Sequence, residues 1–327
     1  MNRVIYALLT TLAATCVQAT AQESTRDAHA LLQRMTWAVQ MLNYEGTFVY
    51  RHNDQLESMQ IAHMVDGDDE FERLLSLNGT AREIIRDNDK VTCIWPDLRS
   101  VLIEKQAPRR AFPVVLPKAL DELAKLYRFV TIGDGRMLGR AVQRVAIKPR
   151  DRHRYGYVFW LDSGTTLPLK SQMVDEEGRV VEEIMFTSLR LYEEFMAEKV
   201  RPATDGATFR WIETQEPEVL PASRTRRWTF GGVPAGYTMT SHTLQRGVGQ
   251  SPPVEHILYS DGLASFSIYI EPANAEGGLL GESHMGAVNA YGLTAGGYHV
   301  TVVGEVPAAT VRAVGESVVF DESVAYQ

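Results

Sequence analysis

Cysteine is almost absent from the chain, which carries two among 327 residues, at positions 16 and 93. Cys16 lies in the N-terminal leader described below, so one thiol would remain in the mature protein and no internal disulfide could form. A single cysteine also cannot complete a structural zinc site. Cys93 stands beside Ile94 and Trp95 in a strand pattern, and we favour a buried small side chain there over a reactive thiol.

Motifs of common catalytic sites are also missing. No two of the eight histidines stand four residues apart with a glutamate between them, as in a helical zinc site. Residues 281–286 hold a serine between glycines, but at the wrong spacing for a nucleophile elbow. Residues 133–139 are rich in glycine, yet they are one residue too long for a phosphate-binding loop, and a hairpin turn is the better interpretation. We therefore expect a binding protein rather than an enzyme, with no catalytic residues, metal or cofactor.

Excess positive charge and long apolar runs are missing as well. The chain has 33 Lys and Arg against 41 Asp and Glu, which gives a net charge of -8 at pH 7. Nucleic-acid binding needs a basic surface that releases counterions, so we expect no nucleic-acid partner. Beyond the N-terminus, no apolar run reaches the roughly 18 residues that a membrane-spanning helix needs.

The N-terminus has the pattern of a signal peptide. A basic residue near the start precedes the apolar residues 4–14, which are too few to span a bilayer, and residues 19–21 fit a cleavage site with small side chains. We expect residues 1–21 to be removed and the exported, soluble chain to begin at Gln22. An uncleaved anchor is the alternative, and a lipoprotein site is disfavoured because threonine rather than a very small residue precedes Cys16.

The mature chain divides into two regions of strand pattern joined by a polar segment. Residues 22–192 predict a large domain, which opens with an amphipathic helix at residues 24–43 and continues as an antiparallel meander. Residues 193–223 are polar and interrupted by prolines, as linkers often are. Residues 224–327 predict a smaller antiparallel sheet with a short helix on one face. The fold class that follows is α+β.

Tight turns divide the first meander into six expected strands. Asn78-Gly79 is a strong hairpin signal, because a type I′ turn needs positive φ at both central residues. The expected strands are residues 44–52, 56–65, 70–77, 82–85, 90–95 and 100–104.

Several strands are apolar on both faces. Phe48 and Tyr50 share one face of the first strand, and Tyr157 and Phe159 share one face of residues 155–161, whose other face is apolar too. A sheet with water on one side normally alternates apolar and polar residues. We therefore expect this sheet to be covered on both sides. We take Phe48, Tyr50, Tyr157 and Phe159 as candidates for lining an apolar binding pocket, with core filling as the plainer interpretation.

Two basic clusters stand out against the acidic average. Arg150, Arg152 and Arg154 precede the aromatic strand, and residues 224–227 hold three more arginines. A solvated turn is the plainer interpretation. The alternative is a site for phosphate or for acidic segments of a partner, which the rigid donor fork of arginine suits. We take Arg150, Arg152 and Arg154 as candidate anion contacts.

Three stretches of the chain together resemble the RseB/MucB family. They are residues 46–51 (Gly-Thr-Phe-Val-Tyr-Arg), the hairpin region 74–88, and residues 260–271 (Ser-Asp-Gly-Leu-Ala-Ser-Phe-Ser-Ile-Tyr-Ile-Glu). The resemblance in element order and domain sizes covers essentially the whole mature chain. Its motifs are structural rather than catalytic.

The resemblance implies a periplasmic negative regulator of the sigma-E type envelope stress response. The large domain would be a half-open antiparallel β-barrel like that of the lipoprotein carrier LolA, with helices packed in its concavity, and the small domain would be absent from carriers. The protein would bind the periplasmic domain of a transmembrane anti-sigma factor and shield it from regulated proteolysis. Lipopolysaccharide or lipoprotein acyl chains would release it. The oligomeric state, including a homodimer, stays open.

Two other functions are consistent with parts of the sequence. A periplasmic lipid or lipoprotein carrier would use the large domain, although the second domain counts against it because a carrier needs only a pocket. An envelope hydrolase would need a histidine or serine and a carboxylate together in one cleft, which a structure can reveal.

Overall fold

The computed structural model of the chain describes residues 27–105, 116, 120–213, 218–219, 227–245, 253–273 and 278–321. The expected signal peptide at residues 1–21 lies outside these residues, and so do the first two arginines of the cluster at residues 224–227. None of the described helices combines the length and the apolar character that crossing a membrane requires.

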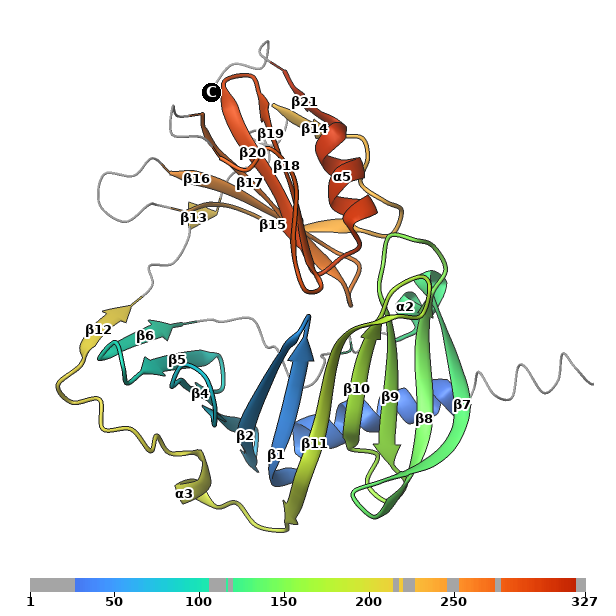
Figure 1. Cartoon of the computed structure of the whole chain (residues 1–327), viewed down its shortest axis with the longest axis vertical. Helices are drawn as coiled ribbons and strands as arrows, with labels where there is room; N and C mark the ends of the chain where they lie inside the picture. The colour runs from blue at the N-terminus through green and yellow to red at the C-terminus, as the bar shows by residue number, and fades with distance from the viewer. Residues whose placement is uncertain are drawn as a thin grey trace, which may run out of the picture.

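Twelve of the described strands form one strongly curved sheet (Figure 1). Its order from edge to edge is β12-β6-β5-β4-β3-β2-β1-β11-β10-β9-β8-β7. Two meanders of antiparallel strands meet where β1 pairs with β11, and only the edge strand β12 pairs parallel, with β6. The strands are β1 (Asn43–His52), β2 (Gln55–Asp66), β3 (Asp69–Ser76), β4 (Glu83–Asp87), β5 (Lys90–Trp95), β6 (Ser100–Glu104), β7 (Tyr127–Met137), β8 (Arg140–Pro149), β9 (Gly156–Asp162), β10 (Pro168–Val174), β11 (Val180–Tyr192) and β12 (Arg210–Glu213).

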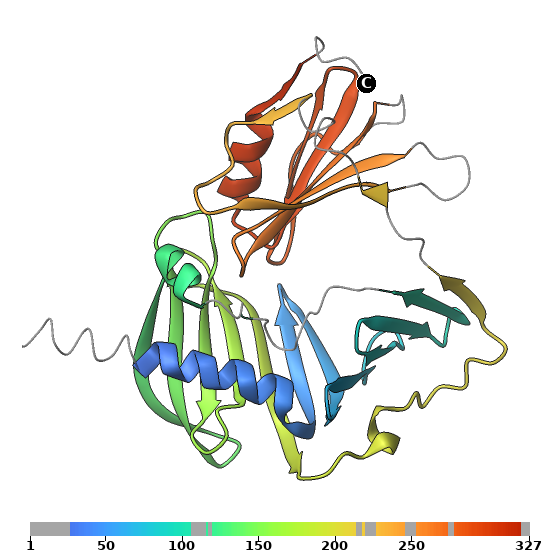
Figure 2. The same ribbon diagram turned by 180° about the vertical axis from the view of Figure 1, so that it is seen from behind.

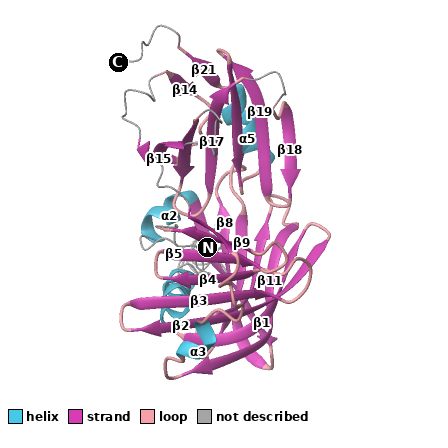
Figure 3. Ribbon diagram, turned by 90° about the vertical axis from the view of Figure 1, so that its left-hand side faces the viewer, coloured by secondary structure: helices cyan, strands magenta, loops and turns pink. Residues whose placement is uncertain are grey.

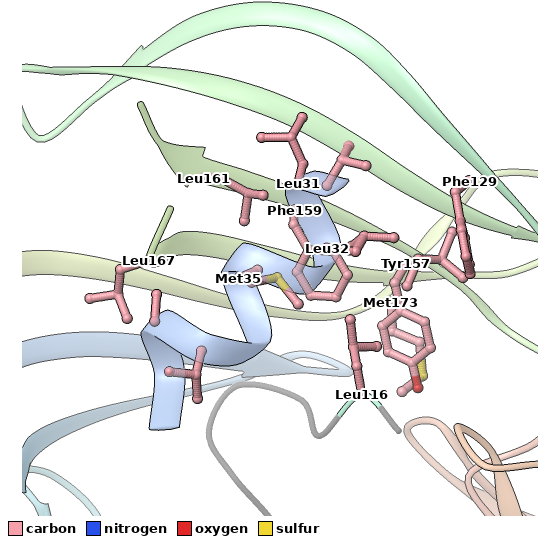
Figure 4. Packing of buried hydrophobic residues seen from close by; sticks show 14 of the residues in the cluster. Leu31, Leu32, Met35, Leu116, Phe129, Tyr157, Phe159, Leu161, Leu167 and Met173 are labelled. Atoms are coloured by element: carbon pink, nitrogen blue, oxygen red, sulfur yellow. The ribbon is translucent and has the colours of Figure 1, made fainter. Parts of the chain in front are cut away.

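A helix over residues 27–41 crosses the inner face of this sheet (Figure 2). Its apolar residues recur three and four positions apart, so they share one face. Leu31, Leu32 and Met35 are buried together with Phe159 and other inner-face side chains of the sheet (Figure 4). A second, shorter helix, α2 (Leu120–Leu126), precedes β7. The helix expected at the start of the mature chain, and its packing on a sheet, are therefore confirmed.

The outer face of β9 is covered less completely than the sequence predicts. Val158 and Trp160 point outward and are half-buried. The ammonium group of Lys170 lies 4.9 Å from the centre of the Trp160 ring. Long side chains can lay their apolar stems on such a surface while the charge stays in water. We expected a second layer over this face, and over Trp160 the lysine of the neighbouring strand provides the cover instead.

The segment expected to be a linker, residues 193–223, packs on the large sheet over its first two thirds. We call residues 193–213 the strap; it contains α3 (Ala197–Val200) and the edge strand β12. The carboxylate of Glu83, which is fully buried, accepts hydrogen bonds from the backbone N–H groups of Ala203 (2.8 Å) and Thr204 (3.1 Å). It also pairs with Arg73 at 2.6 Å. A buried, fully hydrogen-bonded carboxylate fixes the strap to the outer face.

The smaller sheet has seven described strands in the order β13-β15-β16-β17-β20-β19-β18. Seen from the side, it stands at one end of the large sheet (Figure 3). One helix, α5 (Ala308–Glu316), buries Val311 and Val314 against it. The remaining elements are β13 (Glu218–Val219), β14 (Trp228–Phe230), β15 (Thr238–Gln245), β16 (Val254–Ser260), β17 (Ser265–Pro272), β18 (Gly281–Met285), β19 (Val288–Ala295), β20 (Tyr298–Gly304) and β21 (Val318–Phe320). The expected α+β class, a half-open antiparallel barrel with packed helices followed by a smaller sheet with a helix, is confirmed.

Candidate functional site

An apolar pocket of about 300 Å³ opens on the inner face of the large sheet. Strands β1 to β4 form one wall and strands β9 to β11 form the other. The apolar side chains that line the pocket are Phe48, Tyr50, Met59, Leu74, Ile84, Tyr157, Met173 and Ile184. Its volume lies at the lower end of the range for ligand pockets. The pocket is therefore large enough for one or two apolar side chains or part of an acyl chain.

The structure brings together three of the four aromatic residues that the sequence singled out. Phe48, Tyr50 and Tyr157 all line the pocket. Phe159 does not line it and is fully buried among the side chains of the N-terminal helix (Figure 4). Tyr157 and Phe159 share a face of β9, but the helix covers only the second of them. Sequence periodicity gives the face of a strand, and it does not give the point along the strand at which a helix crosses.

The rim of the pocket is rich in carboxylates. Glu57 lies 3.6 Å from Arg82 and 3.5 Å from His52. Glu183 pairs with Lys170 at 2.8 Å. These two acids therefore have basic neighbours that offset their charge.

Two further rim carboxylates have no Lys or Arg within ion-pair distance among the described residues. Glu182 lies on β11, and Glu305 lies in the small domain between β20 and α5. Burial and the nearby Glu305 raise the pKa of Glu182, and hydrogen bonds from the Tyr50 hydroxyl and the Ala287 backbone offset part of that effect. Like charges at close range disfavour the second ionisation. One carboxylate from each domain thus faces the mouth of the pocket without a Lys or Arg partner among the described residues.

A wider, more polar hollow of about 650 Å³ adjoins the pocket. It shares Glu57 and Arg82 with the pocket and includes Trp95 at the end of β5. The side chain of Asn78 shapes its wall, because the amide bonds to the backbone of Ser58 and Leu56 on β2. The pocket and the hollow form one continuous surface that changes from apolar to polar.

The three candidate anion contacts have different environments. Arg152 is exposed. Arg150 is exposed and donates hydrogen bonds to the Ala124 carbonyl of α2 at 3.3 and 3.4 Å. The side chain of Arg154 is fully buried, where its Nε donates to Oδ2 of Asp261 at 2.6 Å. The expectation of an external anion at Arg154 is therefore contradicted, because its guanidinium is already satisfied inside the protein.

Arg154 is the centre of the junction between the two domains. Its guanidinium also pairs with Asp151 and donates to the Ala235 carbonyl, and it lies 4.6 Å from the centre of the Tyr237 ring. The Tyr127 hydroxyl donates to the same Asp261 oxygen at 2.9 Å. Arg154 and Asp261 are both fully desolvated and bonded, whereas Asp151 stays partly exposed, and the buried pair fixes one geometry.

A second contact between the domains lies beside the pocket. The amide of Asn289 donates to the Tyr155 hydroxyl at 3.0 Å and to the Val306 carbonyl at 2.8 Å. Ala287 follows the tight turn at Gly286, where φ is +64°, and it is fully buried in the core of the large domain. Sequence reasoning missed Asn289, Glu182 and Glu305. No local pattern marks them, because each acquires its role from a partner in the other domain.

No group of three or more metal-binding side chains stands together in the part of the chain that the structure describes. Among the described residues, the closest approach to a catalytic pair is His256, whose Nε2 lies 2.9 Å from the Ser267 hydroxyl on the small sheet. The other ring nitrogen of His256 contacts the amide of Gln245 and no carboxylate. This arrangement lacks the acidic group that orients the base of a hydrolase.

Comparison with known proteins matches both halves of the chain to one family. The profile of the MucB/RseB N-terminal domain matches residues 27–204, and that of the MucB/RseB C-terminal domain matches residues 222–319. The sigma factor AlgU regulatory protein MucB of Pseudomonas aeruginosa is 34% identical over 304 residues, which are 89% of this chain and 90% of that protein. The sigma-E factor regulatory protein RseB of Escherichia coli K12 is 24% identical over 299 residues, again 89% and 90% of the two chains.

Solved structures agree with this assignment. The complex structure of Pseudomonas aeruginosa MucA/MucB matches with a TM-score of 0.71 and 31% identity, covering 91% of this chain and 100% of that chain. A crystal structure of MucB in complex with MucA(peri) matches with a TM-score of 0.69, covering 90% of this chain and 100% of that chain.

Proposed function

The chain belongs to the MucB/RseB family, and from this premise we propose that it is a periplasmic regulator that binds the periplasmic domain of a transmembrane anti-sigma factor. Bound in this way, it shields the anti-sigma factor from regulated proteolysis. Its own role is binding, and it has no part in catalysis.

The observation that carries this proposal is that the resemblance spans both domains. The MucB chain solved with MucA is covered over its full length by this chain. The two profiles leave between them only a short gap, which falls within the expected linker. A carrier-like pocket alone would not need the second domain. We accordingly propose that residues 22–192 and 224–327 act as two domains, with residues 193–223 connecting them.

The apolar pocket supports the second part of the proposal, which is release by lipopolysaccharide or lipoprotein acyl chains. Its aromatic and aliphatic lining can hold an apolar chain. We propose that such a chain enters between β4 and β9 and weakens the complex with the anti-sigma factor. The exposed Arg150 and Arg152 stay candidates for contact with anionic groups.

The test uses the mature protein and the periplasmic domain of the anti-sigma factor from the same organism. We expect a complex in a pull-down, slower cleavage of the anti-sigma domain by its protease, and dissociation on addition of lipopolysaccharide. No complex, with or without lipopolysaccharide, would reject the proposal.

A matched pair of variants tests the role of the pocket. Ile84 lines the pocket, whereas its neighbour Ile85 on the same strand points to the other face. Ile84→Asn should raise the lipopolysaccharide concentration that releases the anti-sigma domain, because it places a polar amide in the apolar lining. Ile85→Asn should release the anti-sigma domain at the same lipopolysaccharide concentration as wild type. Equal behaviour of the two variants would show that lipids act elsewhere.

A lipid or lipoprotein carrier is the second candidate, and the same pocket favours it. Its test is transfer of a fluorescent acyl chain from one vesicle population to another by the delipidated protein. Catalytic transfer in the absence of any anti-sigma factor would favour the carrier.

A further inference from the structure

The mouth of the apolar pocket has an unusual distribution of charge. Glu182 and Glu305 approach it from different domains, and neither has a Lys or Arg within ion-pair distance among the described residues. The remaining rim acids are offset by Arg82 and Lys170. The pocket therefore combines an apolar interior with an entrance at which two carboxylates lie without a Lys or Arg partner in the part of the chain that the structure describes.

This charge selects among possible occupants. A phosphate or carboxylate next to an apolar chain would meet Glu182 and Glu305 at the entrance, and repulsion in a partly desolvated site is strong. A cation next to an apolar group would satisfy both carboxylates and bury its apolar part at the same time. The entrance thus favours a cationic, apolar ligand over one whose anionic group lies at the entrance. The releasing acyl chain of the proposed function then competes with this cationic ligand for the same apolar interior.

We propose that this pocket receives an extended polypeptide segment in which a large apolar side chain stands beside a lysine or arginine. The apolar side chain fills the space between Phe48 and Tyr157, and the cation lies between Glu182 and Glu305. This proposal rests on the proposed function, because it assigns the segment to the anti-sigma factor. A volume of about 300 Å³ suits one or two apolar side chains better than a lipid with several acyl chains.

The location of the two carboxylates gives such a segment a further effect. Glu182 belongs to the large domain and Glu305 to the small one, so a cation between them joins the domains. Gly286 of the small domain already lies next to the Glu182 carboxylate, which a side chain at that position would meet. A bound segment would therefore stabilise the arrangement of domains seen here, and added salt would weaken its binding.

Two model peptides test the charge preference directly. Both are acetylated, amidated octapeptides with a central Leu-Phe pair; one has lysines on both sides of the pair and the other has glutamates. Isothermal titration should show the basic peptide binding at least about tenfold more tightly than the acidic one, as expected for hydrogen bonds to charged groups. Equal affinities, or tighter binding of the acidic peptide or of dodecyl phosphate, would overturn the proposal.

Variants of the full mature protein connect this preference to the two carboxylates. Glu305→Gln and Glu182→Gln should each lower the affinity for the basic peptide by about tenfold. Glu305→Lys should reverse the preference and admit the acidic peptide. Glu316→Gln makes the same charge change at an exposed position of α5 and should leave binding unaltered. If Glu305→Gln and Glu316→Gln bind alike, the cation does not lie where we propose.

The anti-sigma domain separates this inference from the function on which it rests. If wild-type protein forms the complex and Glu305→Lys forms it with the same affinity, the inference fails and the proposed function stands. If wild-type protein forms no complex, the proposed function fails, and the two peptides still decide the charge preference of the pocket. Weaker complex formation by Glu305→Lys but not by Glu316→Gln would support both.

Discussion

Methionine in place of Arg154 would remove the positive charge from a fully buried ion pair at the domain junction. The side chains of Arg154 and Asp261 are both 0% exposed, with Nε and Oδ2 2.6 Å apart. Methionine keeps an unbranched side chain that can fill much of the same space. The substitution therefore tests the charge more than the packing.

The expected loss of unfolding free energy can be worked out from the partners that Asp261 keeps. Its carboxylate would still accept hydrogen bonds from the Tyr127 hydroxyl (2.9 Å) and the backbone N–H groups of Leu263 (2.9 Å) and Ala264 (2.7 Å). Removing one partner of a buried ion pair costs about 3–5 kcal/mol, because the other charge stays desolvated. Because these three donors remain, we expect Arg154→Met to lose about 3 kcal/mol of unfolding free energy, near the lower end of that range.

A second, double variant also removes the negative charge of Asp261, which Arg154→Met leaves without its partner. In Arg154→Met/Asp261→Asn, the asparagine oxygen can keep the backbone hydrogen bonds without a negative charge. We expect the double variant to recover at least half of the loss, because neutral replacement of a buried pair is often tolerated. Arg152→Met, two positions away and exposed, is the control and should stay within about 0.5 kcal/mol of wild type.

Urea unfolding, followed by far-UV circular dichroism and by tryptophan fluorescence, measures these differences. The two signals should separate in Arg154→Met if the junction couples the domains, because each domain has its own core. A loss below about 1 kcal/mol, or a double variant no more stable than the single one, would refute the view of Asp261 as a buried charge that depends on Arg154.

Two further predictions concern buried carboxylates of the large sheet. Burial, only partly offset by His63 and Arg86, raises the pKa of Glu72 from 4.5 to about 7. Between pH 4.5 and pH 7 the native state holds a proton on Glu72 that the unfolded chain has lost, so the free energy of unfolding falls as the pH rises through this range. Glu72→Gln should therefore be more stable than wild type by roughly 2–3 kcal/mol at pH 8 and nearly equal to it at pH 4. Urea unfolding at the two pH values measures this difference. Glu83→Gln replaces the carboxylate that binds the strap at Ala203 and should lower the free energy of unfolding by about 2 kcal/mol. A protease should then cut the strap faster in limited proteolysis. An unchanged rate would show that β12 alone holds the strap.

The sequence predicts the large sheet well because its signals are local. Strand patterns and turn residues lie next to one another in the chain, and the expected strands at residues 90–95 and 100–104 match β5 and β6 at both ends. Asn78-Gly79 is an instructive exception. Only Gly79 has positive φ, at 70°, so the two-residue type I′ turn does not form. The Asn78 amide bonds instead to the backbone of β2, an alternative that a local pattern does not contain.

The candidate site is less predictable because it depends on contacts between distant parts of the chain. Phe48 and Tyr157 are 109 positions apart in sequence, yet their strand patterns were enough to suggest that both line a pocket. Nothing near Arg154 distinguishes it from the exposed Arg152, since its burial comes from Asp261 in the other domain. The strap looks like a linker for a related reason: it is polar and interrupted by Pro202, and Glu83, far from it in sequence, holds it in place.

The small domain also borders the pocket, and this has a thermodynamic consequence. Glu305 borders the space that the large sheet leaves open, and Ala287 is buried in the core of the large domain. Asn289 holds both segments by donating to the Tyr155 hydroxyl and to the Ala287 and Val306 carbonyls. A ligand larger than the pocket must therefore shift this edge of the small domain, whereas a segment that bridges both domains must keep it in place. The two ligands then favour different arrangements, and each weakens the other's binding by the same factor. A carrier gains nothing from this coupling, but a regulator that releases its partner when lipid accumulates requires it.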